Sequence, residues 1–217
     1  MSRPILYGVD GSPPTRFCLL TAKAIDLDID YRLVNMAGGE HRSEAFLKKN
    51  PLHTIPVLED DGKFLTDSHA ICTYLVQKYG SAKHQELYPA DLYLRALVDQ
   101  KLYFDTGVLF SKLKPIFLCV FNPAGPTKIP AALLKDIFES YDFLEVFFSH
   151  SKHIAGEKFT LADLCCITTV SSYGFVPIDS AKYPKLTDWV NRMKSLPYYE
   201  VNDKGAKDLI ALTEKCI

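Results

Sequence analysis

The residues best suited to chemistry lie at three predicted turns in the first third of the chain. Ser12 follows a short apolar run and directly precedes Pro13, a position typical of the residue that begins a helix. The amino end of a helix favours an anion, because its N–H groups and its dipole are positive there. A thiolate is such an anion, and a hydroxyl that donates to it lowers the thiol pKa from about 8.5 toward neutrality. Ser12 is therefore a candidate for thiolate activation.

The other two turns carry groups that suit a small peptide. Asp67 and Ser68 open a second predicted helix, and they could hold the ammonium and the carboxylate of an amino-acid head group. Ile55 precedes a proline at the start of a predicted strand, so its backbone can pair with a peptide in β fashion. His41 and His53 could bind a second carboxylate. Together these groups predict a site for a small, acidic peptide that bears a thiol.

The elements that position these groups alternate strand and helix over residues 1–80. Short apolar runs predict strands at residues 5–7, 31–34, 55–59 and 63–66. Apolar residues at helical spacing predict helices between them and after them, at residues 13–27, 43–49 and 68–79. The order βαβαββα is a thioredoxin-like α/β layout. It places the Ser12 turn and the strand-opening Pro56 at the same end of the sheet, where a cis peptide before the proline is the natural way to turn the chain.

The second part of the chain has a different character. Residues 81–89 are polar and predict a linker, and residues 90–217 predict an all-α domain. Helical stripes occur at 91–118, 131–148, 160–170, 186–195 and 199–216, with a Pro/Gly-rich loop at 122–130. Pro115 predicts a kink or a break in the first of these helices. Thr160 and Asp163 form a capping-box pattern, which is interpreted as structural.

Composition limits the class of protein. The 217 residues allow one large domain or two small ones, and 25 Lys+Arg against 26 Asp+Glu give a net charge of −1. That balance excludes strong binding to nucleic acid or to an anionic membrane. The longest apolar run, residues 116–121, is far shorter than a membrane span requires. Six cysteines without zinc-site spacing, and a start without a secretory leader, predict reduced thiols in a cytoplasmic protein.

Stretches along nearly the whole chain resemble the cytosolic glutathione S-transferases, most closely the insect epsilon class and next the delta class. They are Ser12-Pro13-Pro14 with Arg16, Gly39-Glu40-His41, Asn50-Pro51-x-His53-Thr54-Ile55-Pro56-Val57-Leu58, Asp67-Ser68-His69-Ala70-Ile71, Leu87-Tyr88-Pro89, Phe104-x-x-Gly107-Val108-Leu109-Phe110 and Thr160-Leu161-Ala162-Asp163. The resemblance implies the glutathione transferase fold, with a thioredoxin-like N-terminal domain and an all-α C-terminal domain. It further implies glutathione as cosubstrate, no metal, no redox cofactor, and a homodimer.

The resemblance also implies roles for particular residues. Ser12 would stabilise the glutathione thiolate, and the glutathione site would comprise His41, His53, Thr54, Ile55, Pro56, Asp67, Ser68 and His69. Asp67 stands where the family more often has Glu, one methylene longer. Lys112 stands where related epsilon enzymes can carry Arg; it is assigned to the glutathione site, but it lacks the bidentate fork. Candidates for the electrophile pocket along the long helix are Val108, Ser111, Pro115 and Cys119.

The favoured function is conjugation of the glutathione thiolate to small hydrophobic electrophiles, of the detoxification type. Hydroperoxide reduction or elimination of halide would use the same thiolate. The alternative on this fold is a non-catalytic carrier of hydrophobic ligands or an interaction module, but the chain keeps both the hydroxyl and the carboxylate-binding groups. A cysteine-type thiol transferase is disfavoured because Cys18 lies well inside the helix. His84, His150 and His153 are predicted on the surface, and Cys165 and Cys166 in the core.

Overall fold

The strands of the N-terminal part form one mixed sheet in the order β2-β1-β3-β4. A computed structural model describes residues 3–121 and 128–216. The strands are β1 (Ile5–Gly8), β2 (Asp30–Leu33), β3 (Val57–Asp60) and β4 (Lys63–Thr66). β1 pairs in parallel with β2 and antiparallel with β3, and β3 pairs antiparallel with β4. This is the thioredoxin-like sheet that the sequence predicts.

The register of the sheet brings the three chemically interesting turns to one end. Tyr7 of β1 pairs with Val57, and Val57 pairs with Thr66 of β4. The chain segments just after β1, just before β3 and just after β4 therefore leave the sheet at the same edge. Those segments carry Ser12, residues 53–56 and Asp67.

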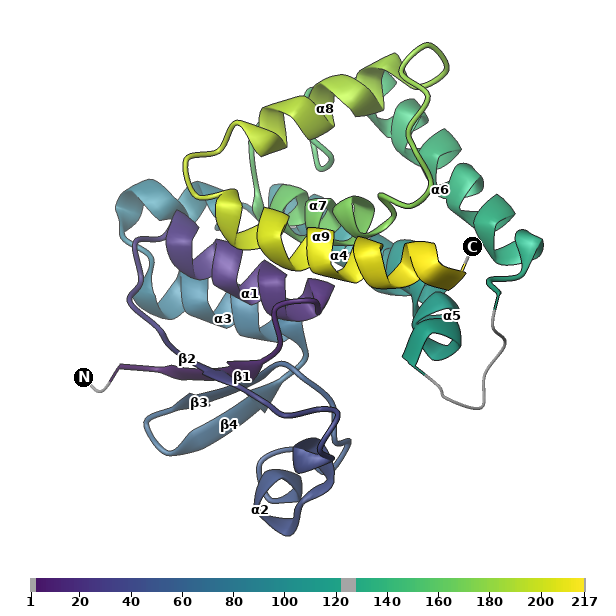
Figure 1. The fold of residues 1–217 in the computed structure, drawn as a ribbon. Helices are drawn as coiled ribbons and strands as arrows, with labels where there is room; N and C mark the ends of the chain where they lie inside the picture. The colour runs from purple at the N-terminus through teal and green to yellow at the C-terminus, as the bar shows by residue number, and fades with distance from the viewer. Residues whose placement is uncertain (1–2, 122–127, 217) are drawn as a thin grey trace.

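Helices cover one face of the sheet and support these turns. The helices of this part are α1 (Pro13–Ala24), η1 (Glu40–Arg42), α2 (Glu44–Leu47) and α3 (Ser68–Tyr79). α1 and α3 lie side by side over the sheet, whereas α2 lies away from them (Figure 1). Phe17 and Leu75 are at most 1% exposed and pack with Leu6 and Leu58 of the sheet into the main core. Removal of this apolar surface from water stabilises the layered arrangement.

The C-terminal part is helical and packs on the α1 and α3 layer (Figure 1). Its elements are η2 (Ala82–Leu87), α4 (Leu92–Phe104), the π-helical turn η3 (Asp105–Leu109), α5 (Phe110–Phe121), α6 (Ala131–His150), α7 (Leu161–Ser172), α8 (Pro184–Lys194), α9 (Glu200–Thr213) and η4 (Glu214–Cys216). α7 is buried on nearly every side, as expected of a helix that is apolar or small all round. Cys165 and Cys166 lie in this core helix, as predicted.

The long helix departs from regular geometry at a different place from the one predicted. The N–H of Phe110 donates to the carbonyl of Asp105, five residues back, so the irregular turn lies upstream of Pro115. α5 then continues through Pro115 to Phe121. The predicted break near Pro115 is therefore not observed, and the alternative of a kink there stays a prediction. Most of the predicted loop at 122–130 lies outside the described residues.

A buried arginine joins the two parts of the molecule. Arg16 of α1 has no exposed surface, and its guanidinium donates to Ser171, Ser172 and Asn202 of α7 and α9. Burial lowers the pKa of Arg16 to about 10, against a smaller opposing effect of Tyr199. The cation stays charged near neutrality, because three polar side chains replace its water.

Asp163 organises the start of α7, as its capping-box pattern predicts. Its carboxylate accepts from the N–H of Thr160 at 3.0 Å and from the indole N–H of Trp189 at 2.9 Å. It also lies 3.2 Å from Nδ1 of His153. His153 and His84 are both buried, so the prediction that they lie on the surface is wrong. His153 lies against the carboxylate of Asp163, and the ring of His84 accepts a hydrogen bond from the backbone N–H of Ser81. The sequence does not reveal either contact.

The segment predicted as a linker is ordered and packed. It contains η2, and it buries His84, Leu87 and Tyr88 against the core. Within the described ranges, no helix is both long enough and apolar enough to cross a membrane.

Candidate functional site

Ser12 caps α1 with its side chain. Its Oγ accepts from the backbone N–H of Thr15 at 3.4 Å, and its backbone N–H donates to the carbonyl of Val9 at 3.1 Å. A hydroxyl has two acceptor lone pairs and one proton. Capping uses a lone pair, so the O–H of Ser12 remains available as a donor to a ligand.

The amino end of α1 differs in one respect from the sequence-based expectation. Pro13 and Pro14 occupy the first two helical positions and carry no N–H. The next N–H, that of Thr15, already donates to Ser12. An anion at this turn would therefore be held by the Ser12 hydroxyl and the helix dipole, with little help from backbone amides.

The turn before β3 is fixed by an asparagine. Nδ2 of Asn50 donates to the carbonyl of Thr54 at 2.8 Å and lies 2.9 Å from Oγ1 of the same residue. The peptide between Ile55 and Pro56 is cis, which is the isomer that suits the turn but that the sequence alone left open. Asn50 stood in the sequence motif, but its positioning role was missed, because only the folded turn shows which amide faces which carbonyl.

Asp67 caps α3 and holds His69. A single oxygen, Oδ1, accepts from the backbone N–H groups of His69 and Ala70 at 2.9 and 3.3 Å. The same oxygen lies 3.2 Å from Nδ1 of His69. Oδ2 is thus the oxygen left for a ligand ammonium. These bonds, the one with His69 foremost, outweigh burial and lower the pKa of Asp67.

Two of the predicted site residues have strained backbones. Asp67 has φ +70° and His53 has φ +46°, in the region that residues other than glycine seldom adopt. Such strain persists only where surrounding contacts enforce it, and it clusters at functional sites. Ser68, the first residue of α3, is buried beside Asp67.

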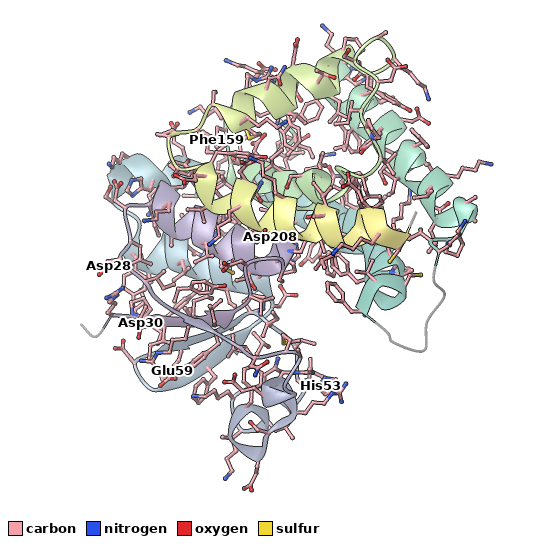
Figure 2. The ribbon with its side chains drawn as sticks, in the orientation of Figure 1. Asp28, Asp30, His53, Glu59, Phe159 and Asp208 are labelled. Carbon is pink, nitrogen blue, oxygen red and sulfur yellow. The ribbon has the colours of Figure 1, made fainter. Side chains whose placement is uncertain are left out.

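His41 and His53 lie together, as predicted. Their rings are 6.2 Å apart, centre to centre, and Figure 2 shows His53 beside α2, at the other end of the sheet from Asp28 and Asp30. Burial, assisted by Arg42 and His53, lowers the pKa of His41. Nδ1 of His41 is buried and has no hydrogen-bond partner in the described part of the chain. This pair offers ring nitrogens to an acidic ligand.

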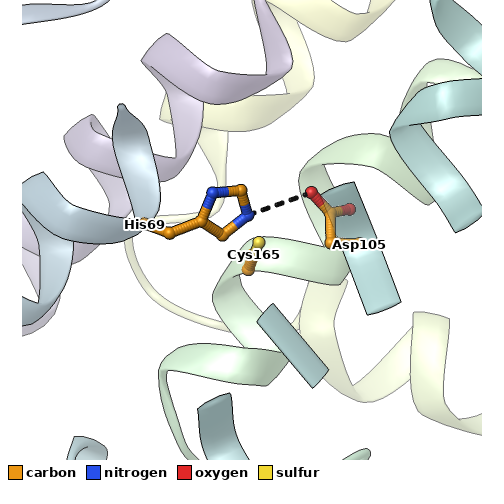
Figure 3. A group of neighbouring side chains, drawn as sticks. All are labelled: His69, Asp105 and Cys165. Atoms are coloured by element: carbon orange, nitrogen blue, oxygen red, sulfur yellow. Dashed lines mark ion pairs between the residues drawn. The ribbon is translucent and has the colours of Figure 1, made fainter. Parts of the chain in front are cut away.

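His69 is held by contacts that the sequence did not predict. Its Nε2 lies 3.4 Å from Oδ2 of Asp105 (Figure 3), so the ring lies between two carboxylates. Burial alone would lower its pKa, but hydrogen bonds with Asp105 and Asp67 raise the pKa of His69 to about 10. Thr106 also approaches the ring, with Oγ1 3.3 Å from Nε2. Sequence reasoning missed Asp105 and Thr106; the only signal was an acid inside an otherwise apolar helical stripe.

Residues predicted farther along the long helix do not all converge on the turns. Lys112 pairs with Glu139 of α6 at 2.6 Å, and its Nζ lies over the ring of Phe143. Ser111 is exposed and donates to carbonyls of its own helix. The remaining pocket candidates are half-buried along η3 and α5: Val108, Pro115 and Cys119.

Cavities occur elsewhere as well. A groove of about 690 Å³ lies between α1, β2 and α9, and another of about 410 Å³ lies between α6, α7, α8 and α9. Neither is lined by a predicted site residue. Cavity volume alone therefore does not identify the candidate site.

Comparison with known proteins defines the class. Residues 6–83 match the family described as "Glutathione S-transferase, N-terminal domain", and residues 111–197 match "Glutathione S-transferase, C-terminal domain". The chain belongs to the glutathione S-transferase family, as its motifs predict. It is 41% identical over 211 residues to "Glutathione S-transferase 1" of Manduca sexta, which covers 94% of each chain.

Solved structures agree with this assignment. A glutathione transferase homologue from Drosophila mojavensis, with bound glutathione, is 45% identical, has a TM-score of 0.94 and covers 100% of this chain and 98% of its own. An epsilon-class glutathione S-transferase from the housefly, Musca domestica, is 47% identical with a TM-score of 0.93, covering 98% and 97%. The predicted fold is confirmed, and the similar structures include the epsilon class.

Proposed function

We propose that the protein conjugates the thiolate of glutathione to small hydrophobic electrophiles, with Ser12 as the group that stabilises the thiolate. The single observation that carries this proposal is the state of the Ser12 hydroxyl. It accepts one long hydrogen bond at the start of α1 and keeps its proton available. The bound glutathione of the Drosophila mojavensis homologue supports the choice of thiol.

The mechanism follows from charge and position. The O–H of Ser12 and the positive end of α1 stabilise the thiolate more than the thiol, so they lower the pKa of the bound thiol. The ammonium of glutathione would lie at Oδ2 of Asp67 and the peptide would pair with the backbone of Ile55. His41 and His53 would meet the second carboxylate. The thiolate then attacks an electrophile that is held beside it. Activation of the thiol and proximity of the two reactants therefore account for the acceleration.

The electrophile would bind between the Ser12 turn and the η3–α5 segment. Val108, Pro115 and Cys119 supply apolar surface there, with Ser111 at the rim. Lys112 is engaged with Glu139, so a role in binding glutathione would require that ion pair to open. Neither a metal nor a redox cofactor enters this reaction.

The test is the ultraviolet difference spectrum of bound glutathione as a function of pH. The wild-type protein should show a thiolate band that titrates well below the free thiol. In Ser12→Ala the titration should move upward while glutathione still binds. Glutathione that binds with an unshifted thiol would contradict the catalytic proposal and favour a carrier.

We also propose that the protein is a homodimer through α4. Leu92 and Tyr103 are 82% and 77% exposed, and they lie about three helical turns apart on one face. Neighbouring Tyr93 is also largely exposed. Apolar surface of this extent on one helix is typical of a protein–protein interface.

The proposal of a dimer is tested by sedimentation. Tyr103→Glu should convert the dimer to a monomer, because the interface would bury an unpaired charge. Leu212→Glu, on the exposed side of α9, is the matched control and should leave the mass unchanged. A wild-type monomer at working concentration would contradict the proposal.

A cytosolic location also remains a proposal; it is supported by the six cysteines, none of which forms a disulfide.

A further inference from the structure

The loop that carries Ser12 is held by parts of the chain that lie far from it in the sequence. Residues 9–12 connect the end of β1 to the start of α1. Within this loop the backbone N–H of Ser12 donates to the carbonyl of Val9 at 3.1 Å. Gly11 lies between them, and a glycine leaves the backbone a wide choice of conformations. A single conformation of the loop therefore depends on contacts from outside it.

Asp10, in the middle of the loop, is held through its side chain by β2. The hydroxyl of Tyr31 donates to Oδ1 of Asp10 at 2.8 Å. Burial, and after it the hydrogen bond with Asp10, raise the pKa of Tyr31, so the phenol keeps its proton near neutral pH and remains a donor. Lys204 of α9 faces Oδ2 of Asp10, but an exposed pair at 3.9 Å contributes little. The bond from Tyr31 is therefore the contact that fixes this side chain.

The backbone of Asp10 is held by α9, which lies beside α1 (Figure 1). A Cβ added to Gly205 would overlap the carbonyl oxygen of Asp10, so the helix and the loop are in backbone contact there. α9 is fixed to α1 in turn, because the guanidinium of Arg16 donates to Asn202. The backbone N–H of Arg16 donates to the carbonyl of Ser12 at 2.9 Å. β2 and α9 thus both hold the residue that lies two positions before Ser12.

The Ser12 hydroxyl needs this support, because its own helix holds it weakly. Its bond from the N–H of Thr15 is 3.4 Å long. A donor stabilises a charge effectively only when the protein fixes it at the place of that charge, and a displacement of about 1 Å can cost about 100-fold in rate. Asp10 is not one of the groups proposed to contact glutathione. Any effect of Asp10 on the reaction would therefore act through Ser12.

We propose that Asp10 is a positioning residue of the transfer reaction: anchored by Tyr31, it fixes the loop that carries the Ser12 hydroxyl. This inference rests on the proposed function, because it requires that Ser12 stabilises the thiolate. Asp10 acts through position and not through charge. A carboxylate near a thiolate would by itself raise the thiol pKa and oppose activation. Loss of the anchor and loss of the charge therefore shift the thiol pKa of bound glutathione in opposite directions.

The test compares the full-length wild-type protein with Tyr31→Phe, Asp10→Ala and Asp10→Asn. The ultraviolet thiolate band of bound glutathione gives the thiol pKa, and a chromogenic electrophile gives kcat/KM. Tyr31→Phe and Asp10→Ala should raise the thiol pKa and lower kcat/KM by about 3- to 10-fold, the range that one lost hydrogen bond supports. Asp10→Asn should keep kcat/KM near the wild-type value, because its amide oxygen still accepts from Tyr31.

The variants should fold, because the contact is open to water. The Asp10 side chain is 38% exposed, and both partners line the groove of about 690 Å³ between α1, β2 and α9. The double variant of Tyr31→Phe with Asp10→Ala should be no worse than either single variant, because all three lack the same bond.

Tyr88→Phe is the matched control. The hydroxyl of Tyr88 donates to Oδ1 of Asp99 at 2.9 Å, so this variant loses the same kind of bond at a place far along the chain from Ser12. It should keep the wild-type thiol pKa and kcat/KM. A general effect of losing a tyrosine–carboxylate bond would appear in both tyrosine variants, whereas the positioning effect appears only in Tyr31→Phe.

Hydrogen exchange supplies a readout that needs no glutathione. The backbone N–H of Ser12 should exchange faster in Tyr31→Phe and Asp10→Ala than in the wild type and Tyr88→Phe, because the loop opens more readily. Wild-type exchange together with a wild-type thiol pKa in Tyr31→Phe would overturn the proposal. A lower thiol pKa in Asp10→Ala would also overturn it, by showing that the charge of Asp10 matters and its anchor does not.

Failure of the proposed function would look different. A wild-type protein that binds glutathione with an unshifted thiol would refute thiolate activation by Ser12, and with it the role of Asp10 in transfer. The exchange rate of the Ser12 N–H would still show whether Tyr31 anchors the loop. A wild-type thiol pKa that is lowered, and that stays lowered in Tyr31→Phe, would refute the positioning role alone.

Discussion

The hydroxyl Oγ of Ser12 accepts a hydrogen bond of 3.4 Å from the backbone N–H of Thr15. That distance is at the long end for an N–H···O bond, so the cap is weak. The helix therefore positions the hydroxyl through one weak hydrogen bond, and the O–H proton stays available to a ligand. A capping residue of this kind can serve a ligand without a large loss of stability.

Ser12→Ala should therefore separate activity from stability. Loss of one preorganised donor to a developing or bound anion reduces kcat/KM by about 100-fold. Loss of the weak cap should lower the free energy of unfolding by only about 0.5 kcal/mol. Steady-state kinetics with a chromogenic electrophile and urea unfolding measure the two effects.

Asp91→Ala is the control for a lost cap. Asp91 caps α4 through a 2.9 Å bond to the N–H of Leu94, far along the chain from the predicted glutathione site. It should lower stability by about 1 kcal/mol and leave the thiol pKa of bound glutathione unchanged. A Ser12→Ala protein with wild-type kcat/KM would refute the activation role.

Asp67→Asn should weaken glutathione binding without unfolding α3. The amide oxygen can still accept from the N–H groups of His69 and Ala70, and Asn tolerates positive φ. Only the negative charge is lost, which removes a charge-assisted bond to the ligand ammonium worth about 1.5–3 kcal/mol. The KM for glutathione should rise at least about tenfold, while urea unfolding at pH 7 shows only a small loss of stability, because His69 keeps its pairing with Asp105 but loses that with the half-exposed Asp67. An unchanged KM would show that the ammonium binds elsewhere.

Asp60 should make the N-terminal hairpin sensitive to acid. Burial favours its neutral form, but hydrogen bonds from Lys78, Tyr79 and Tyr74 outweigh burial and lower the pKa of Asp60 below its usual 3.8. A group whose pKa is lower in the folded state stabilises the fold above its unfolded pKa, near 4. That contribution is lost as the pH falls through the lower, folded-state pKa.

Asp60→Asn should therefore lower the free energy of unfolding by about 2 kcal/mol at pH 7. The difference from wild type should shrink below pH 4, where the wild-type carboxylate takes up its proton. Urea unfolding at several pH values checks both points. Glu86→Gln is the control, because its ion pair with Lys158 is about two-thirds exposed and contributes at most about 1 kcal/mol. A constant difference at all pH values would contradict the assignment.

Gly205 of α9 should not tolerate a methyl group. A Cβ at this position would overlap the backbone carbonyl of Asp10, just before the Ser12 turn, and would also crowd Arg16. Gly205→Ala should lower the free energy of unfolding by about 2–3 kcal/mol. Because the overlap displaces the Ser12 turn, kcat/KM should fall as well.

Gly107→Ala is the matched substitution in open space. No atom lies within 4 Å of a Cβ built at Gly107, and its backbone is helical. This change should leave stability unchanged or raise it by about 0.5–1 kcal/mol. Circular-dichroism melts of both variants make the comparison, and equal Tm values would contradict the close approach of α9 to Asp10.

The sequence by itself determined the order of elements and the groups at the three turns. Periodicity and turn residues act over a few neighbours, so α3 was predicted with its observed bounds, Ser68–Tyr79. Pro56 sets the turn before β3, and the Ser12–Pro13 pair begins α1. Both effects are local, so the sequence alone was enough to predict them. The family followed from the same local stretches.

Only the tertiary structure decided which distant side chains meet. Asp105 faces His69 across 36 positions of sequence, and Arg16 reaches Asn202 across 186. Lys112 pairs with Glu139, and His153 is buried against Asp163, because helix packing sets these neighbours. No local pattern encodes such contacts: they depend on the angle and register at which two helices pack, and these are fixed by the whole core.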